Sequence, residues 1–223
     1  AFAQSSQAVG HITPVVDSDG GIRRVPAVVC FQGQAYPALA VAALSAATGV
    51  QPLLKNNLGL AQSGQTIDVG GLQLPIDAKG QLRVSYQMPR SGFASVSAVD
   101  VIQGKVPAHM LKGAWVLVGS TAFGGGDAVP TPQGGAVGGV EIHAQILSAA
   151  LDGRTPFVPA WAPLWPLATG LVALLVLVFS LRAAGPKAAL VMPLVALATV
   201  ASIFGLHAVL LLNLHHWLGW GQP

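Results

Sequence analysis

The sequence predicts an α/β domain with a mixed sheet, followed by a transmembrane helical hairpin. Helical and strand-like hydrophobic patterns alternate through residues 1–157, which hold nearly all of the charged side chains. Beyond them, two long apolar runs contain only two charged residues, Arg182 and Lys187. Just 9% of the whole chain is charged, far below the roughly 25% of a soluble domain. Part of the chain is therefore expected to lie in lipid.

Turn residues divide the first 90 residues into short elements. Residues 17–21 (DSDGG) and 77–80 (DAKG) are predicted turns, and residues 55–65 a loop. The hydrophobic pattern predicts strands over 23–31 and 35–39, a helix over 41–49 that ends at Gly49, a hairpin over 66–77 with a Gly-Gly turn, and a strand over 82–87.

The second part of the domain ends in a clear helix. Residues 140–153 place Ile142, Ile146 and Leu147 on one helical face and end at Gly153. Before it we expect a short helix over 95–104 capped by Ser95 or Ser97, a helical turn over 107–113, and a buried central strand over 114–120 (AWVLVGS). This order of helix, strand, Gly-rich loop and helix favours a two- or three-layer α/β domain.

The apolar runs predict two membrane spans, residues 164–182 and 188–212, since about 20 apolar residues cross a bilayer. The turn between them, 183–187, adjoins the only cations of this half, which marks it as cytoplasmic. Residues 1–157 then lie outside the cytoplasm, and the Trp-containing residues 213–223 form an outer interfacial tail leading to a third span. The alternative, two buried helices of a soluble protein, fits the basic turn less well.

Composition argues against two other classes of function. The net charge is only +3, and Arg23-Arg24 is the closest basic pair, so no nucleic-acid partner is expected. Cys30 is the single cysteine, which excludes an intramolecular disulfide and a Cys-based zinc site. Its apolar neighbours predict a buried thiol. The opening residues AFAQSSQ lack a signal-peptide pattern, so we expect the chain to begin inside a longer protein.

A loop with seven glycines between Gly124 and Gly139 stands between the predicted strand and the last helix. That setting is typical of a phosphate-binding loop, but the loop carries no Lys or Arg, and its prolines remove N–H donors. The G-x-S-x-G pattern of hydrolases is also absent. A membrane-anchored serine hydrolase using Ser120, His143 and Asp127 remains a weaker alternative.

The acidic and histidine side chains near this loop do not predict a metal site or any cofactor. Glu141 and His143 stand two residues apart, about 200° around a helix, and so face away from each other. We expect Glu141 in the first helical turn, where a carboxylate meets the positive end of the helix dipole. His215 and His216 could bind a metal or respond to pH, but polar residues at a membrane interface are the favoured interpretation.

Three stretches of the chain resemble the CHASE domain type 2, a bacterial extracellular sensory domain. They are VDSDGGIRRVPAVVCFQGQAYPALAVAAL, LPIDAKGQLRVSYQMP, and residues 98–151 with the KGAWVLVGST run and the GVEIHA helix start. The resemblance covers residues 8–155, and the two spans that follow also match. It implies a periplasmic sensory domain in a multi-pass protein of the bacterial inner membrane.

The resemblance further implies an unidentified small-molecule or protein ligand, a homodimer, and a cytoplasmic nucleotide cyclase or kinase elsewhere in the protein. It implies no catalytic residue in the sensor. Candidate ligand-binding residues match the family's loop and DG-turn patterns: Asp127, Thr131, Glu141, His143, Arg23 and Arg24. The alternative is an envelope assembly or interaction protein that binds through the Gly/Pro loop and has no effector.

A proline-containing linker joins the last helix of the domain to the first span. Residues 152–163 include Pro156, Pro159 and Pro163. Because proline fixes φ, such a linker is semi-rigid and is expected to transmit a displacement of the helix to the membrane.

Overall fold

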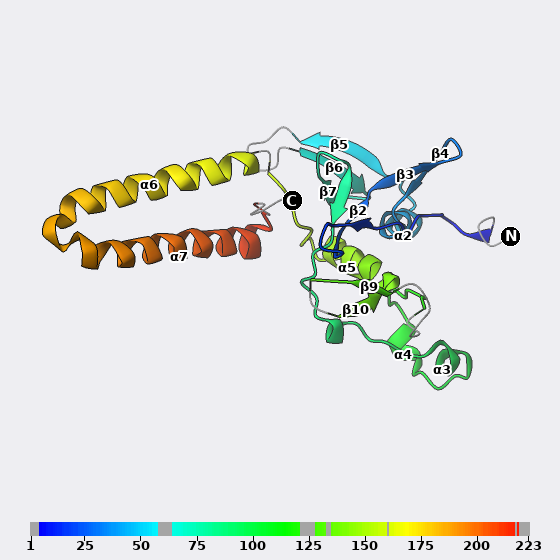
Figure 1. The fold of residues 1–223 in the computed structure, drawn as a ribbon. Helices are drawn as coiled ribbons and strands as arrows, with labels where there is room; N and C mark the ends of the chain where they lie inside the picture. Colours follow the sequence, from blue (N-terminus) through cyan, green and yellow to red (C-terminus); the bar gives the residue numbers. More distant parts are fainter. Residues whose placement is uncertain are drawn as a thin grey trace. The chain divides into compact units, whose positions relative to one another are not determined.

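A computed structural model of the chain describes residues 5–57, 64–120, 128–132, 135–159, 161–216 and 218. The chain divides into two compact units (Figure 1). The first comprises residues 1–55 and 65–155, and the second residues 56–64 and 156–223. Asp127, Trp217 and Trp220 lie outside the described residues.

The first unit is built on a six-stranded sheet with the order β1-β2-β8-β7-β6-β5. Its strands are β1 (Val15–Val16), β2 (Ile22–Pro26), β5 (Leu53–Asn57), β6 (Gly64–Val69), β7 (Leu72–Ile76) and β8 (Gln81–Arg83). The described register pairs of this sheet are antiparallel. The prediction of a mixed sheet is therefore wrong for these pairs. Tight turns join β6, β7 and β8, and such turns permit only antiparallel neighbours.

The predicted hairpin over 66–77 is confirmed, and glycine explains its turn. Gly70 and Gly71, between β6 and β7, have φ of 60° and 90°. A type I′ turn needs positive φ at both central positions. A second hairpin joins β3 (Val28–Phe31) to β4 (Gln34–Pro37) as a separate two-stranded sheet. The predicted single strand over 23–31 therefore divides at Ala27 into β2 and β3, which belong to different sheets. Cys30 lies on it and is exposed, which corrects the predicted burial: its apolar neighbours belong to a hairpin that the core does not enclose.

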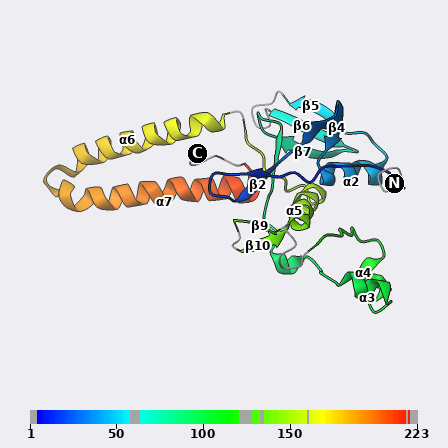
Figure 2. The same ribbon diagram turned by 45° about the vertical axis from the view of Figure 1, so that its right-hand side comes forward.

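Two helices complete the core of the first unit. They are α2 (Leu39–Thr48), which ends at the left-handed Gly49 as predicted, and α5 (Gly139–Leu151). The helices contact each other, and α5 contacts β7 (Figures 1 and 2). The predicted face of α5 is confirmed as buried. The main core side chains are Val25, Val41, Leu44, Val69, Leu74, Leu82, Ile142 and Ile146.

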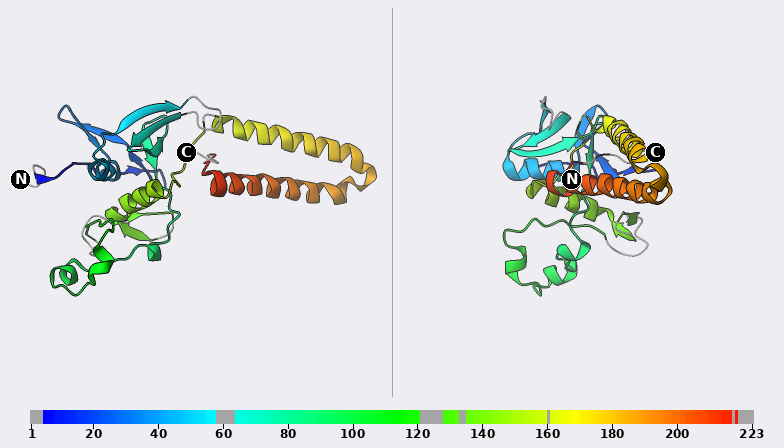
Figure 3. Two further views of the ribbon diagram at one scale, coloured as in Figure 1. Left: turned by 180° about the vertical axis from the view of Figure 1, so that it is seen from behind. Right: turned by 90° about the vertical axis from the view of Figure 1, so that its left-hand side faces the viewer.

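The segment between β8 and α5 differs most from the prediction. The short helices α3 (Ala98–Ile102) and α4 (Ala108–Leu111) form as expected on the green segment of Figure 3. Ser97 is the N-cap residue of α3, but its side chain makes no capping hydrogen bond. Neither helix has a buried residue. Residues 114–120 form neither a strand nor a helix, and Val118 is 85% exposed. The predicted buried central strand is therefore wrong. Within this run, Leu117 packs against the core formed by the sheet, α2 and α5, but it is only partly buried. A 3-10 turn, η1 (Arg90–Gly92), precedes α3.

Strands also replace two predicted loops. β5 takes up the beginning of residues 55–65, where it pairs at the edge of the sheet. In the Gly-rich region, β9 (Ala128–Pro130) pairs antiparallel with β10 (Ala136–Gly138), directly before α5. The turn-forming residues predicted a loop here, and the sequence pattern did not reveal the two short paired strands within the region.

The second unit contains two apolar helices, α6 (Trp165–Ala184) and α7 (Ala188–Leu214). The 3-10 turns η2 (Ala162–Leu164) and η3 (Gly185–Lys187) precede them, and the helices contact each other. Among the described residues, the helical stretch Ala162–Asn213 is long and apolar enough to cross a membrane. Its hydropathy reaches 2.3, and none of that window is buried in the structure.

Candidate ligand-binding site

An ion-pair cluster forms where the DSDGG turn folds β1 back onto β2. The Gly20 N–H donates to the Asp17 carbonyl at 2.9 Å, which brings the turn carboxylates beside the arginines of β2. Arg23 donates to Asp17 at 3.0 Å and to Asp19 at 2.7 and 2.8 Å. Arg24 also donates to Asp17. One carboxylate thus joins two neighbouring guanidinium groups.

Asp17 is the enclosed member of this cluster, with 8% of its side chain exposed. Burial opposes ionisation of Asp17, but hydrogen bonds from Arg24 and Arg23 together hold its pKa below the usual range. The pKa of Asp19 is also lowered, chiefly by its hydrogen bond from Arg23. Both carboxylates are therefore charged at neutral pH.

Arg83 adds a third cation, whose charge interacts with Arg24, Asp17 and Arg23. Arg24 and Arg83 are register partners on β2 and β8, and the next pair, Val25 and Leu82, belongs to the core. Since neighbouring residues of a strand point to opposite faces, the two arginines share the face away from the core. Burial, followed by the nearby charge of Arg24, lowers the pKa of Arg83.

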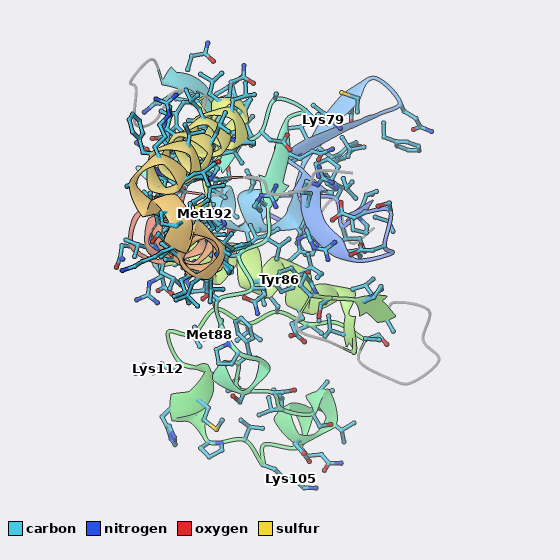
Figure 4. The ribbon with its side chains drawn as sticks, turned by 60° about the vertical axis from the view of Figure 1, so that its left-hand side comes forward. Lys79, Tyr86, Met88, Lys105, Lys112 and Met192 are labelled. Carbon is cyan, nitrogen blue, oxygen red and sulfur yellow. The ribbon has the colours of Figure 1, made fainter. Side chains whose placement is uncertain are left out.

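Tyr86 connects this cluster electrostatically with the start of α5. Its hydroxyl donates to the Ile22 carbonyl on β2, and burial raises its pKa. The charges of Arg23 and Glu141 act on the same phenol. Figure 4 shows Tyr86 and Met88 along the segment that leaves β8. That segment is tied to α5 by Gln145, which is fully buried and donates to the Met88 carbonyl at 2.7 Å.

The structure brings some of the predicted site residues together and leaves others apart. Arg23 and Arg24 share Asp17, and Glu141 lies in the first turn of α5, as predicted. His143 is only 2% exposed, within α5. Thr131 lies between β9 and β10, and its N–H donates to the Gly135 carbonyl at 3.4 Å. Asp127 lies outside the described residues.

Sequence reasoning missed Arg83 and Tyr86. Arg83 stands between Leu82 and Val84, which are both buried, so alternation alone marks it as a residue of the opposite face. Tyr86 follows the end of β8, and no local pattern indicates that its hydroxyl reaches a strand 64 residues earlier.

The chemistry of this region suits recognition more than catalysis. Guanidinium, phenol and carboxylate groups can bind polar ligands through charge-assisted hydrogen bonds. Within the described part of the chain, no three His, Cys, Asp or Glu side chains are grouped so as to hold a metal ion. Burial of His143 inside the core argues against its service as a general base for Ser120.

Comparison with known proteins agrees with this interpretation. The model of the CHASE2 domain matches residues 1–182, from the first residue to Arg182 in α6. No curated protein and no solved structure matches the chain. The match covers most of the 223 residues. The chain therefore belongs to the CHASE2 family, the extracellular sensory domains of signalling receptors.

Proposed function

We propose that this chain is the ligand-sensing region of a bacterial transmembrane receptor. The α/β unit lies in the periplasm, and α6 and α7 cross the inner membrane as a hairpin. The observation that carries the proposal is a CHASE2 match that ends in a pair of long apolar helices. The match itself continues into α6.

The dimensions and surface of the helices support a bilayer environment. At 1.5 Å per residue, the 20 residues of α6 extend about 30 Å, close to the thickness of a hydrocarbon core. Large apolar side chains face outward along both helices, and Phe179 is 66% exposed. Such a surface is unfavourable in water and favourable in lipid.

The two ends of the helix pair indicate its orientation. Arg182 and Lys187 adjoin the turn between the helices, where basic residues favour the cytoplasm. At the other end, the Phe157 N–H donates to the His215 carbonyl at 2.9 Å. The rings of Trp161 and Trp165 lie 6.1 Å apart there, as expected for an interfacial aromatic belt. The start of α6 and the end of α7 are thus joined on the same side.

The proposal extends to the remainder of a receptor. A third span after residue 223 would lead to a nucleotide cyclase or a kinase, and two copies would act as a homodimer. The exposed apolar segment around Ile102 and Val118 favours one alternative, an envelope interaction protein without an effector. The sequence of the full-length protein separates them, since a cyclase or kinase region would support the receptor.

Cys30 provides a direct test of the topology, because it is the single cysteine and is exposed. A membrane-impermeant maleimide should label it in cells with a permeabilised outer membrane. In a Cys30→Ser background, a Gly185→Cys variant should react only after the inner membrane is opened, because Gly185 lies in the basic turn. Labelling of Gly185→Cys from the periplasm would contradict the hairpin.

A further inference from the structure

A pocket of about 300 Å³ lies in the first unit, between the N-terminal segment and the β3–β4 hairpin. Its described lining includes no residue of the ion-pair cluster and none of the described residues of the Gly-rich region. Its described lining residues are Gly10, His11, Thr13, Val29, Phe31 and Tyr36. Its volume is at the lower end of the range for small-molecule sites.

One face of the hairpin forms the floor of this pocket. Val29 and Tyr36 are register partners on β3 and β4, and Phe31 stands two residues after Val29. Residues at this spacing share a face of the strand, so the three side chains project together. Phe31 is 60% exposed. A large ring held open to solvent beside two apolar neighbours is typical of a binding surface.

The N-terminal segment forms the opposite wall and is held in place by its backbone. The His11 N–H donates to the Pro37 carbonyl, and the Leu39 N–H donates to the His11 carbonyl, both at 2.9 Å. Gly10 approaches the start of α2 so closely that a Cβ would lie 2.8 Å from the Leu39 Cα. Only glycine permits this contact, so the wall is fixed by the fold.

Two of the rings are oriented before any ligand arrives. His11 Nε2 lies 3.0 Å from the Pro26 carbonyl, and its Nδ1 accepts the Thr13 N–H at 3.2 Å. Together these bonds require the neutral tautomer with the proton on Nε2. Burial also lowers the pKa of His11, although the bond to Pro26 opposes this. Tyr36 donates its hydroxyl to Gln34 at 2.9 Å. Orienting the rings in advance reduces the entropy lost on binding.

The lining determines the kind of ligand. No Asp, Glu, Lys or Arg is among the described lining residues, so nothing there would balance a ligand's charge. Phe31 and Tyr36 offer ring faces and edges, and the Thr13 hydroxyl offers one hydrogen bond. We infer that this pocket binds a small uncharged molecule with an aromatic ring. Its role as a sensory site rests on the proposed receptor function, whereas binding itself does not.

Binding can be measured on the chain as it stands, reconstituted in lipid nanodiscs, with indole as the probe. Saturation-transfer NMR should show saturable contact with indole and little contact with benzoate, a charged ring of similar size. Phe31→Ala should weaken indole binding about tenfold, because one aromatic contact is lost. Val29→Trp should abolish it by filling the pocket. Trp115→Ala, a partly exposed aromatic outside the lining, is the matched control and should leave binding unchanged.

Subtracting the signal of the Val29→Trp variant from that of the wild type removes the contribution of indole dissolved in the lipid. If this difference is zero, or if benzoate binds as well as indole, the inference is overturned. Should Val29→Trp fail to fold, Phe31→Ala decides alone, and equal indole affinity in that variant and the wild type would refute the site. The Cys30 labelling pattern tests the receptor topology separately, so the two proposals can fail independently.

Discussion

At the scale of single residues, Asp17 is the residue on which the polar face of the sheet depends. It accepts hydrogen bonds from both Arg23 and Arg24 and has 8% of its side chain exposed. Without this carboxylate, two guanidinium groups would lie side by side with Arg83 nearby. Removing one partner of an enclosed pair is costly, because the other charge stays desolvated.

Asp17→Asn should therefore lower the free energy of unfolding by about 2 kcal/mol. Asp19→Asn is the matched control, since Asp19 is 57% exposed and exposed pairs contribute little. Thermal unfolding of the detergent-solubilised chain, followed by circular dichroism, measures both. Equal effects of the two substitutions would show that enclosure of Asp17 does not matter.

The stability difference between the wild type and Asp17→Asn should depend on pH. Because the pKa of Asp17 is lowered in the folded state, its stabilisation is complete above the ordinary value near 4 and is lost as pH falls through the lowered value. The wild type and Asp17→Asn should therefore converge in stability at low pH.

Only part of this cluster could be predicted from sequence. Arg23 and Arg24 stand next to the DSDGG turn, so their proximity to a carboxylate follows from a few residues of chain. Arg83 and Tyr86 arrive from elsewhere, through the pairing of β2 with β8. Strand pairing between distant segments depends on the whole sheet, which local patterns do not specify.

At the scale of elements, Gly119 marks where the exposed segment returns to the core. A Cβ at this position would lie 2.5 Å from the Val140 Cβ, in the first turn of α5. Gly119 thus allows the chain to pass against the helix start, although residues 114–120 form no strand.

Gly119→Ala should destabilise the first unit by about 1–3 kcal/mol through overpacking. Val140→Gly removes the Cβ and both Cγ atoms that would clash, so adding Gly119→Ala to Val140→Gly should cost much less stability than adding it to the wild type. A double-mutant cycle on thermal unfolding measures this coupling. Additive effects of the two substitutions would contradict the close contact.

Elements fixed by local rules were predicted well, and those fixed by partners were not. The Gly70-Gly71 turn and the end of α2 at Gly49 follow from backbone conformations that glycine adopts readily. The run AWVLVGS has the composition of a buried strand, but a strand also needs a neighbour with free backbone groups. The apolar composition of this run can be recognised in the sequence, whereas the presence of a neighbouring strand cannot.

The base of the helix pair in the second unit is a further element with a testable property. The His216 ring lies 5.9 Å from that of Phe157 and 6.1 Å from that of Trp161. Burial, with His215 adjacent, lowers the pKa of His216. Because the unfolded chain then binds a proton first, stability should fall as pH drops below about 6.5.

His216→Phe should remove this part of the pH dependence while keeping an aromatic ring at the base. Near-ultraviolet circular dichroism of the tryptophans, recorded in nanodiscs between pH 7.5 and 5, reports whether the aromatic packing around residue 216 is kept. Comparison with the wild type cancels contributions from other histidines, such as His11. The same pH profile in both proteins would show that His216 does not titrate as expected.

At the scale of the whole molecule, residues 152–164 connect the end of α5 in the first unit to the start of α6 in the second. Pro156 and Pro159 are buried in this linker, and the Ala162 N–H donates to the Pro159 carbonyl at 2.9 Å. The predicted semi-rigid linker thus contains fixed proline φ angles and a defined turn. In the proposed receptor, this is the covalent path from the sensor to the membrane.

Replacing Pro156, Pro159 and Pro163 by glycine should uncouple the two ends of that path, because glycine adds backbone freedom at three positions. In the full-length receptor, the ratio of stimulated to basal effector activity should fall by about 2- to 30-fold, corresponding to roughly 0.5–2 kcal/mol of coupling. Pro52→Gly, outside the linker, should leave the ratio unchanged. Unaltered Cys30 labelling would show that the variant is inserted correctly. Full signalling by that correctly inserted variant would mean that linker stiffness does not transmit the signal.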